Sequence, residues 1–424
     1  MKILKNPPRS EWEQICLRPS SADPLVWQQV ENIIQRVRSS GDEALRDLSE
    51  EFDHCRPESF VVSDEEIRLA SLSLSDSLKQ AIRKAAGNIE AFHRAQMPAT
   101  VQVQTSPGVT CIQKPVPIDR VGLYVPGGTA PLFSTVLMLA IPAKVAGCSE
   151  TVLCTPARDG KVAPEVLYAA SLCSVSRIFK IGGAQAIAAM ALGTESVPRV
   201  CKIFGPGNRY VTVAKQILGN REVSVDMPAG PSEVMVLADG SANPRYVAAD
   251  LLSQAEHGPD SQVMLVCTDE TIALRVLDEV SLQTETLARG KFIGESLRKS
   301  CAIVFDSLQN ILDFANTYGP EHLIISMENP WTVAEGVRNA GSVFVGNYSP
   351  ESAGDYASGT NHTLPTCGWA ASCSGVNIDS FLKKITFQEL SREGLQGLSD
   401  TIIVMARAEG LDAHANAVIQ RIAK

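Results

Sequence analysis

The feature that most constrains the fold is a repeated alternation of apolar strands and helical segments between residues 120 and 234. Glycine-rich turns lie at three of the strand–helix junctions. Strands that alternate with helices indicate a parallel sheet covered by helices on both faces. We therefore expect an open α/β domain whose ligand binds at the carboxyl ends of its strands. The four predicted strands are residues 121–125, 151–154, 178–181 and 200–204.

A second series of the same kind follows and predicts a second sheet. Its apolar runs are residues 233–237, 263–267, 301–305, 322–325 and 341–346. Amphipathic patterns at residues 24–52, broken at Gly41, and at 63–94 predict early helices, which we expect to return to this second sheet. Residues 347–374 read as a loop, and 381–410 and 411–422 as helices.

The expected organisation has four parts. An N-terminal arm (1–22) precedes a discontinuous first α/β domain, made of residues 23–119 with 236–376. A second α/β domain (120–235) carries the glycine-rich turns, and residues 377–424 form a helical segment. Such a division suits a chain of 424 residues, because one hydrophobic core rarely serves that length.

Composition narrows the class of protein. The net charge of −9, with no Lys/Arg-rich block, argues against a nucleic-acid partner. No uncharged apolar run is long enough for a bilayer span, and the N-terminus lacks a signal-peptide core, so we expect a cytoplasmic protein with no membrane partner. The eleven cysteines form no Cys-x-x-Cys pair, which favours reduced thiols. Cys111 and Cys148 are candidate aldehyde nucleophiles, but neither has a histidine nearby in sequence, and a structural role is favoured.

Histidine is scarce in this chain, with six in total, and several lie in polar runs. Asp250, Gln254 and His257 fall at i, i+4 and i+7 of a predicted helix, so they share one face, and Gly258 is a plausible stop. One interpretation is a histidine placed favourably at the negative end of the helix dipole. The other interpretation is half of a ligand set for a metal ion.

Other polar residues extend the metal hypothesis. Asp355 and His362 lie in the predicted loop, where functional groups are often held, although a polar loop is usually only a loop. With Gln254 and His257 they would offer nitrogen and oxygen donors to a divalent cation, zinc first.

Glu321 and His322 directly precede an apolar strand. A carboxylate beside a histidine suits two proton transfers with different acceptors. The alternative is a solvated strand start.

The turn Gly205-Pro-Gly-Asn208 has only the first two glycines of G-x-G-x-x-G and could equally be a plain turn. The pairs Gly127-Gly128 and Gly182-Gly183 occupy equivalent turns. Together, three such turns in one sheet indicate a dinucleotide-binding crevice more strongly than any one of them does alone.

Motifs spread in order over most of the chain resemble those of the histidinol dehydrogenase family. They are RVGLYVPGG (120–128), GGAQA (182–186), FGPGNRY (204–210), DMPAGPSE (226–233), LLSQAEHG (251–258), GPEHL (319–323), GDYASGTNH (354–362) and EGLDAH (409–414). The resemblance implies two related, incomplete Rossmann-like domains with aldehyde-dehydrogenase-like architecture. The broken G-x-G-x-x-G agrees with that fold. Cys367 and Trp369 depart from the Gly-Gly-Ala of many members, which puts the local loop shape in doubt.

The resemblance also implies an activity: zinc-dependent, four-electron oxidation of L-histidinol through L-histidinaldehyde to L-histidine with two NAD+, the last steps of histidine biosynthesis. One zinc ion per subunit would be held by Gln254, His257, Asp355 and His414. Substrate would contact these ligands and Ser232, Glu321, His322 and Glu409, and NAD would contact Tyr124, Gln185 and Asn208.

In the roles that the family implies, His322 takes the alcohol proton and assists again in the second oxidation, and Glu321 activates the water that hydrates the aldehyde. Glu409 and His414 would complete the partner's site in a homodimer. Two alternatives stay open: a zinc-dependent hydrolase acting on a small amine-containing substrate, and a non-catalytic binding relative.

Overall fold

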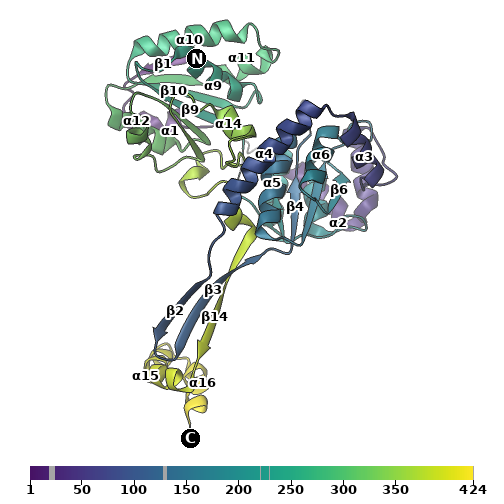
Figure 1. Ribbon diagram of the computed structural model, residues 1–424, viewed down its shortest axis with the longest axis vertical. Coiled ribbons are helices and arrows are strands. Elements are labelled where there is room, and N and C mark those ends of the chain that lie inside the picture. The colour runs from purple at the N-terminus through teal and green to yellow at the C-terminus, as the bar shows by residue number, and fades with distance from the viewer. Residues whose placement is uncertain (19–23, 128–130, 220, 229, 424) are drawn as a thin grey trace.

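The chain has two α/β lobes and a long stalk that carries the C-terminal helices, as the computed structural model shows (Figure 1). The structure describes residues 1–18, 24–127, 131–219, 221–228 and 230–423. One lobe is built on a five-stranded sheet and the other on a six-stranded sheet, while three antiparallel strands form the stalk.

The five-stranded sheet is parallel and has the order β6-β5-β4-β7-β8. Its strands are β4 (Arg120–Tyr124), β5 (Glu150–Thr155), β6 (Arg177–Lys180), β7 (Lys202–Phe204) and β8 (Ser224–Val225). The four predicted strands are confirmed, and β8 was not foreseen. The connecting helices are α5 (Phe133–Ala146), α6 (Pro164–Leu172), α7 (Gly183–Leu192) and α8 (Arg209–Gly219).

The six-stranded sheet is also parallel, in the order β1-β11-β10-β9-β12-β13. Its strands are β1 (Lys2–Lys5), β9 (Glu233–Ala238), β10 (Gln262–Cys267), β11 (Cys301–Val304), β12 (His322–Ser326) and β13 (Ser342–Val345). Its helices are α1 (Arg9–Ile15), α9 (Pro244–Ala255), α10 (Glu270–Thr284), α11 (Gly290–Arg298), α12 (Leu308–Tyr318), α13 (Pro330–Ala334) and α14 (Glu351–Tyr356).

The two sheets are related. In each, the first strand of its series lies at the centre, the second and third follow on one side, and the fourth and fifth lie on the other. This is the strand order of a dinucleotide-binding fold without its sixth strand. The expectation of two incomplete Rossmann-like units is confirmed, and the N-terminal arm adds β1 as an extra edge strand beside β11.

The early helices pack on the other lobe from the one expected. They are α2 (Pro24–Asp53), α3 (Asp64–Ser73) and α4 (Asp76–Ala95). Val30 and Leu45 of α2 share a core with Val152 of β5, and Ile82 of α4 shares one with Leu123 of β4. Grouping residues 24–95 with residues 236–376 was therefore wrong. An amphipathic pattern predicts that a helix has a buried face, but it does not predict which sheet packs against that face.

The break expected at Gly41 is confirmed, because that residue has a φ of +48° inside α2 and kinks it. The C-terminal segment is not all helical. Residues 382–390 form β14 (Leu382–Leu390), which pairs with β3 (Val109–Pro117), and β3 pairs with β2 (Val101–Ser106). Two short 3-10 turns (Trp369–Ala371 and Ile378–Phe381) precede β14, and α15 (Arg392–Ala408) and α16 (Asp412–Ile422) follow it.

Among the described residues, no helix combines the length and the apolar character needed to cross a bilayer. All eleven cysteines are free thiols.

Candidate active site

Two buried residues meet where β9 and β12 begin. Glu321 directly precedes β12 and His322 is its first residue, and His322 lies in register with Val234 of the neighbouring β9. The backbone N–H of Glu233 donates to Oε2 of Glu321 at 2.8 Å, and Nδ1 of His322 contacts the Glu233 carbonyl at 3.2 Å. Glu321 and His322 are 6% and 3% exposed. The adjacent carboxylate and imidazole are thus a buried pair and not a solvated strand start.

A second polar group faces this pair from helix ends. His257 follows the C-terminus of α9, and Glu351 and Asp355 lie on α14. Ligand-type atoms of His257, Glu351 and Asp355 all lie within 4.8 Å of one another. Nε2 of His322 lies 3.7 Å from Oδ1 of Asp355. The Glu321–His322 pair and these potential metal ligands therefore share one site.

Electrostatics within this site are dominated by buried carboxylates. Burial raises the pKa of Glu321 to about 8, because desolvation penalises the anion more than His322 stabilises it. Burial opposes protonation of His322, but Glu351, Glu321 and Asp355 outweigh it and raise the pKa of the imidazole to about 10. Burial also opposes ionisation of Asp355, yet His322 holds the pKa of that carboxyl below its usual value.

Gln254 lies between the two groups. It is fully buried on α9. Because a carboxylate only accepts hydrogen bonds, the amide nitrogen of Gln254 belongs toward Oε1 of Glu351 and its oxygen toward the N–H of Glu233, 2.8 Å away. Gln254 and His257 both reach Glu351 and so share one site, but α9 ends at Ala255, so His257 lies beyond the helix and not on the helix face expected for it.

Glu351 was missed by the reasoning from sequence. It is 1% exposed, and its Oε2 atom has no hydrogen-bond partner among the described residues. Residues 347–374 had been read as a loop, whereas α14 puts Glu351 and Asp355 four residues apart on one helix face. The signal that could have revealed it was that i, i+4 spacing, which has meaning only once a helix is assumed.

Other expected residues differ in their positions. Ser232 directly precedes β9 and is half-buried beside the pair. His362 links Asp355 to the other lobe, since its Nδ1 contacts the backbone carbonyl of Asp355 at 2.9 Å and its Nε2 contacts the Thr135 hydroxyl at 3.1 Å. Asp250 lies one turn before Gln254, and burial raises its pKa to about 7. Glu409 and His414 are exposed at the far end of the stalk, so the single chain does not bring them to the site (Figure 1).

The expected cofactor contacts gather in a different place. Tyr124, Gln185 and Asn208 line one cavity of about 1180 Å³ at the carboxyl ends of the five-stranded sheet. The Tyr124 hydroxyl accepts a hydrogen bond from the N–H of Gly183 at 3.0 Å, and burial raises the pKa of the phenol to about 12. Residues 51–54 at the end of α2 also line the cavity and were not foreseen, because α2 had been placed on the other sheet.

The glycine-rich turns shape this cavity. Gly127 and Gly183 line it, while Gly128 lies outside the described residues. Gly205 has a φ of +128°, and a Cβ there would overlap the Tyr124 carbonyl oxygen, so the turn requires glycine. Asp226 accepts from the N–H of Gly205 at 2.7 Å and pairs with buried Lys215.

Comparison with known proteins identifies the family. A family model described as histidinol dehydrogenase matches residues 17–422. Histidinol dehydrogenase from Bacteroides thetaiotaomicron is 54% identical over 423 residues, covering 100% of this chain and 99% of the relative. The enzyme of that name from Escherichia coli O6:H1 is 52% identical over 412 residues, covering 96% and 94%.

A solved structure agrees with the sequence comparisons. The crystal structure of histidinol dehydrogenase from Elizabethkingia anophelis superposes with a TM-score of 0.97 at 49% identity, covering 100% of this chain and 98% of that one. The motifs along the sequence and the geometry of two related sheets point the same way. The chain belongs to the histidinol dehydrogenase family.

Proposed function

We propose that this chain is a zinc-dependent enzyme that oxidises L-histidinol through L-histidinaldehyde to L-histidine with two NAD+, the last steps of histidine biosynthesis. Family membership makes it an NAD-dependent oxidoreductase. The observation that carries the proposal is the buried Glu321–His322 pair beside the His257, Glu351 and Asp355 cluster. The cavity at Tyr124, Gln185 and Asn208 supports a separate place for NAD.

The side chains fit a zinc ion. His257, Asp355 and the amide of Gln254 are oxygen and nitrogen donors of the kind zinc accepts, and Glu351 adds a carboxylate with an unpartnered oxygen. We assign Gln254, His257 and Asp355 as ligands, with His414 of a second copy completing the set. Zinc bound by these residues would supply positive charge that offsets the carboxylates around His322 and favours its neutral imidazole, and it would help to hold the substrate.

His322 acts as the general base of the first oxidation. Its Nδ1 hydrogen is directed to the Glu233 carbonyl, which leaves Nε2 with a lone pair. That nitrogen has no hydrogen-bond partner among the described residues and can accept the alcohol proton. As the O–H proton moves to Nε2, the carbinol carbon transfers hydride to NAD+ and becomes the aldehyde.

Glu321 acts in the second oxidation. In its ionised form it takes a proton from the water that adds to the aldehyde carbon, while protonated His322 returns its proton to the aldehyde oxygen, which gives the hydrated aldehyde and a neutral imidazole. His322 then accepts an O–H proton of that hydrate while its carbon transfers the second hydride to another NAD+, which yields the carboxylic acid. Two neighbouring groups with different pKa values suit two such transfers.

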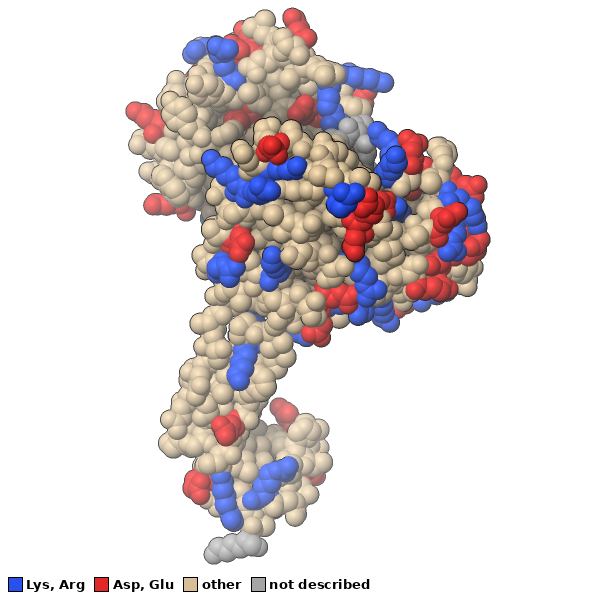
Figure 2. Space-filling model, turned by 45° about the vertical axis from the view of Figure 1, so that its right-hand side comes forward, with Lys and Arg blue, Asp and Glu red and all other residues tan. Residues whose placement is uncertain are grey.

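A homodimer completes the site in this proposal. The strands and helices of the stalk carry apolar side chains that are exposed in a single chain. Charged side chains are sparse on the face of the stalk seen in Figure 2. Such a surface favours burial against a second copy. These exposed residues are Val101, Val103, Ile385, Phe387, Leu390, Val404 and Met405.

The test is formation of NADH, followed by absorbance, with L-histidinol and zinc-loaded protein. We expect two NADH per L-histidinol consumed. A silent trace with zinc present would count against the dehydrogenase, and release of a hydrolysis product would favour the zinc hydrolase instead. One NADH per L-histidinol would refute the four-electron reaction.

A further inference from the structure

Glu233 holds both members of the buried pair through its backbone. Its N–H donates to Oε2 of Glu321 at 2.8 Å, and its carbonyl accepts from Nδ1 of His322 at 3.2 Å. The carboxylates of Glu321 and Glu351 lie farther from Nδ1, at 3.6 and 3.8 Å. The position of the Glu233 peptide therefore decides both the direction of the Glu321 carboxylate and which imidazole nitrogen of His322 carries hydrogen.

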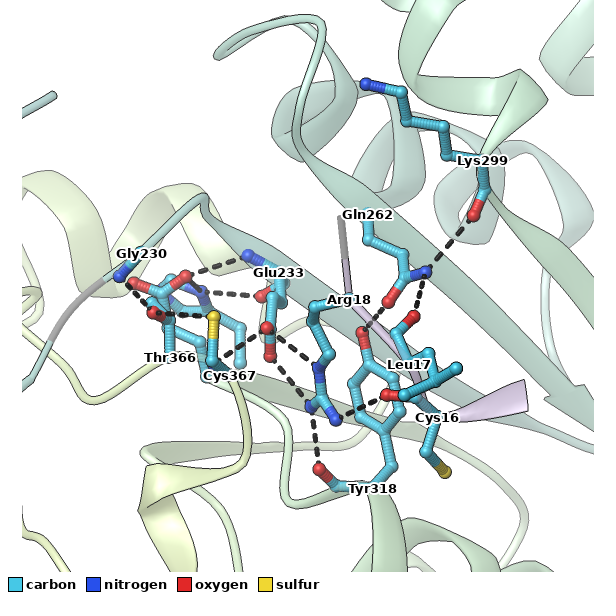
Figure 3. Close-up of polar contacts among 12 residues, drawn as sticks. Cys16, Leu17, Arg18, Gly230, Glu233, Gln262, Lys299, Tyr318, Thr366 and Cys367 are labelled. Atoms are coloured by element: carbon cyan, nitrogen blue, oxygen red, sulfur yellow. Dashed lines mark hydrogen bonds and ion pairs between the residues drawn. The ribbon is translucent and has the colours of Figure 1, made fainter. Parts of the chain in front are cut away.

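The Glu233 side chain has contacts of its own, separate from those of its backbone (Figure 3). It is 1% exposed and receives a forked contact from Arg18, with Nε to Oε1 at 3.0 Å and Nη2 to Oε2 at 3.1 Å. The N–H of Cys367 donates to the same Oε1 at 2.8 Å. Bidentate pairing of a guanidinium with a carboxylate fixes orientation as well as distance.

Arg18 also contacts Tyr318, which lies just before the Glu321–His322 pair in the sequence. Its Nη2 donates to the carbonyl of Tyr318 at 2.7 Å, and its guanidinium lies over the Tyr318 ring at 3.6 Å (Figure 3). Tyr318 is the last residue of α12, and the turn at Gly319 brings the chain directly to Glu321. Through Glu233 and Tyr318, Arg18 therefore links the start of β9 to the turn at Gly319. The Glu321–His322 pair follows that turn, at the start of β12.

We propose that Arg18 and Glu233 are positioning residues for the Glu321–His322 pair, so that one residue of the N-terminal arm, Arg18, supports the catalytic pair. The inference rests on the proposed function. Neither residue touches the substrate. The guanidinium clamps the Glu233 side chain, the side chain anchors its own peptide, and the peptide orients both the carboxylate and the imidazole. Small displacements of catalytic groups strongly reduce turnover, even when binding contacts survive.

Kinetics of Arg18→Gln separate this role from a merely structural one. We expect kcat per folded, zinc-loaded subunit to fall about 10- to 100-fold, with KM for L-histidinol changed less than about twofold. Arg18→Lys keeps the charge but loses the fork and the ring contact, so we expect partial recovery of kcat. Trp12→Leu is the matched control, because it loosens the same arm at a distance from Glu233 and should lower the melting temperature with kcat unchanged.

If Arg18→Gln fails to fold, because Glu233 is left buried without its cation, the double variant Arg18→Gln/Glu233→Gln replaces it. This variant keeps hydrogen-bonding side chains of similar length without a charge, and the same loss of kcat is expected. A kcat within about twofold of wild type in whichever of these two variants folds overturns the proposal. An equal loss in Trp12→Leu also overturns it, since the arm would then act through stability alone.

A spectroscopic measurement adds a readout that does not depend on turnover. In zinc-loaded protein labelled with ¹⁵N-histidine, the His322 resonances are assigned by their loss in His322→Asn. We expect the Nδ1 signal to shift in Arg18→Gln and to stay unchanged in Trp12→Leu; an unchanged signal in Arg18→Gln refutes the link. Full turnover of His322→Asn would instead refute the role of His322 itself, so failure of the proposed function is distinguishable from failure of the positioning role.

Discussion

At the scale of single residues, His322 gives the most direct prediction. His322→Asn should reduce turnover of L-histidinol about 10²- to 10⁴-fold, because amide nitrogen cannot accept the alcohol proton. Zinc content should remain normal, since His322 is not an assigned ligand. Steady-state kinetics and metal analysis of the same preparation check both statements. Turnover like that of wild type would refute the role as base.

Glu321→Gln should reduce the rates of the two oxidations unequally. We expect oxidation of L-histidinaldehyde to fall more than oxidation of L-histidinol, because the amide cannot take a proton from water while the first hydride transfer does not need that step. Single-turnover measurements with each substrate give the comparison. Equal losses in the two reactions would contradict the division of roles between Glu321 and His322.

The thiols should be dispensable. Burial raises the pKa of Cys148 to about 11, so at pH 8 this side chain is protonated and a poor nucleophile. Cys111 lies in β3 of the stalk, on a different part of the chain from the pair. Cys111→Ala and Cys148→Ala should each retain both oxidations, as NADH assays with both substrates would show. Loss of aldehyde oxidation alone in either variant would instead support a covalent thiol intermediate.

Scarcity and position made several site residues visible in the sequence. His257 and His322 stood out as scarce histidines in polar runs and Asp355 as a carboxylate in a predicted polar loop, and the structure brings these three together. Glu351, Arg18 and Glu233 carried no such mark. A glutamate or an arginine is usually a surface residue, and only burial shows that these are not.

At the scale of elements, the turn after β7 depends on one glycine. Gly205→Ala should impair folding or NAD binding, since its φ of +128° disfavours a side chain and the Cβ would overlap the Tyr124 carbonyl oxygen. Thermal melting and NAD titration test this. Gly87→Ala is the matched control in the interior of α4, where nothing lies within 4 Å of the added Cβ, and it should stabilise the protein by about 0.5–1 kcal/mol. Normal melting and NAD affinity in Gly205→Ala would contradict the requirement.

The elements that the sequence revealed are those with a buried pattern. The strands of both parallel sheets are continuous apolar runs, because helices cover both faces, and they were found nearly in full. The stalk strands β2 and β14 are exposed along almost their whole length. β2 alternates valine with glutamine over residues 101–104, and β14 alternates apolar with polar residues over 385–388, but both runs are short. The helix expected over residues 381–410 is therefore wrong for β14.

At the scale of the whole molecule, the exposed end of the stalk predicts sharing of sites between subunits. A hybrid dimer of one His322→Asn chain and one His414→Ala chain should have about half the turnover of wild type, because one site keeps its own His322 and receives an intact His414 from the partner. Co-expression with two affinity tags yields the hybrid. Both parent homodimers should be inactive. An inactive hybrid would show that His414 serves its own chain, and an active His414→Ala homodimer would show that it serves no site.

Local patterns in the amino-acid sequence predict two series of strands and helices, the glycine turns between them and the polar residues that interrupt them. Periodicity and backbone preference act over a few residues, so they are readable without a structure. Tertiary structure alone decided which sheet α2 to α4 cover, that the stalk is built from three distant strands, and that Arg18 reaches Glu233 across more than two hundred positions. These contacts depend on packing between segments far apart in the chain, and no local pattern encodes the partner of a buried face or a buried charge.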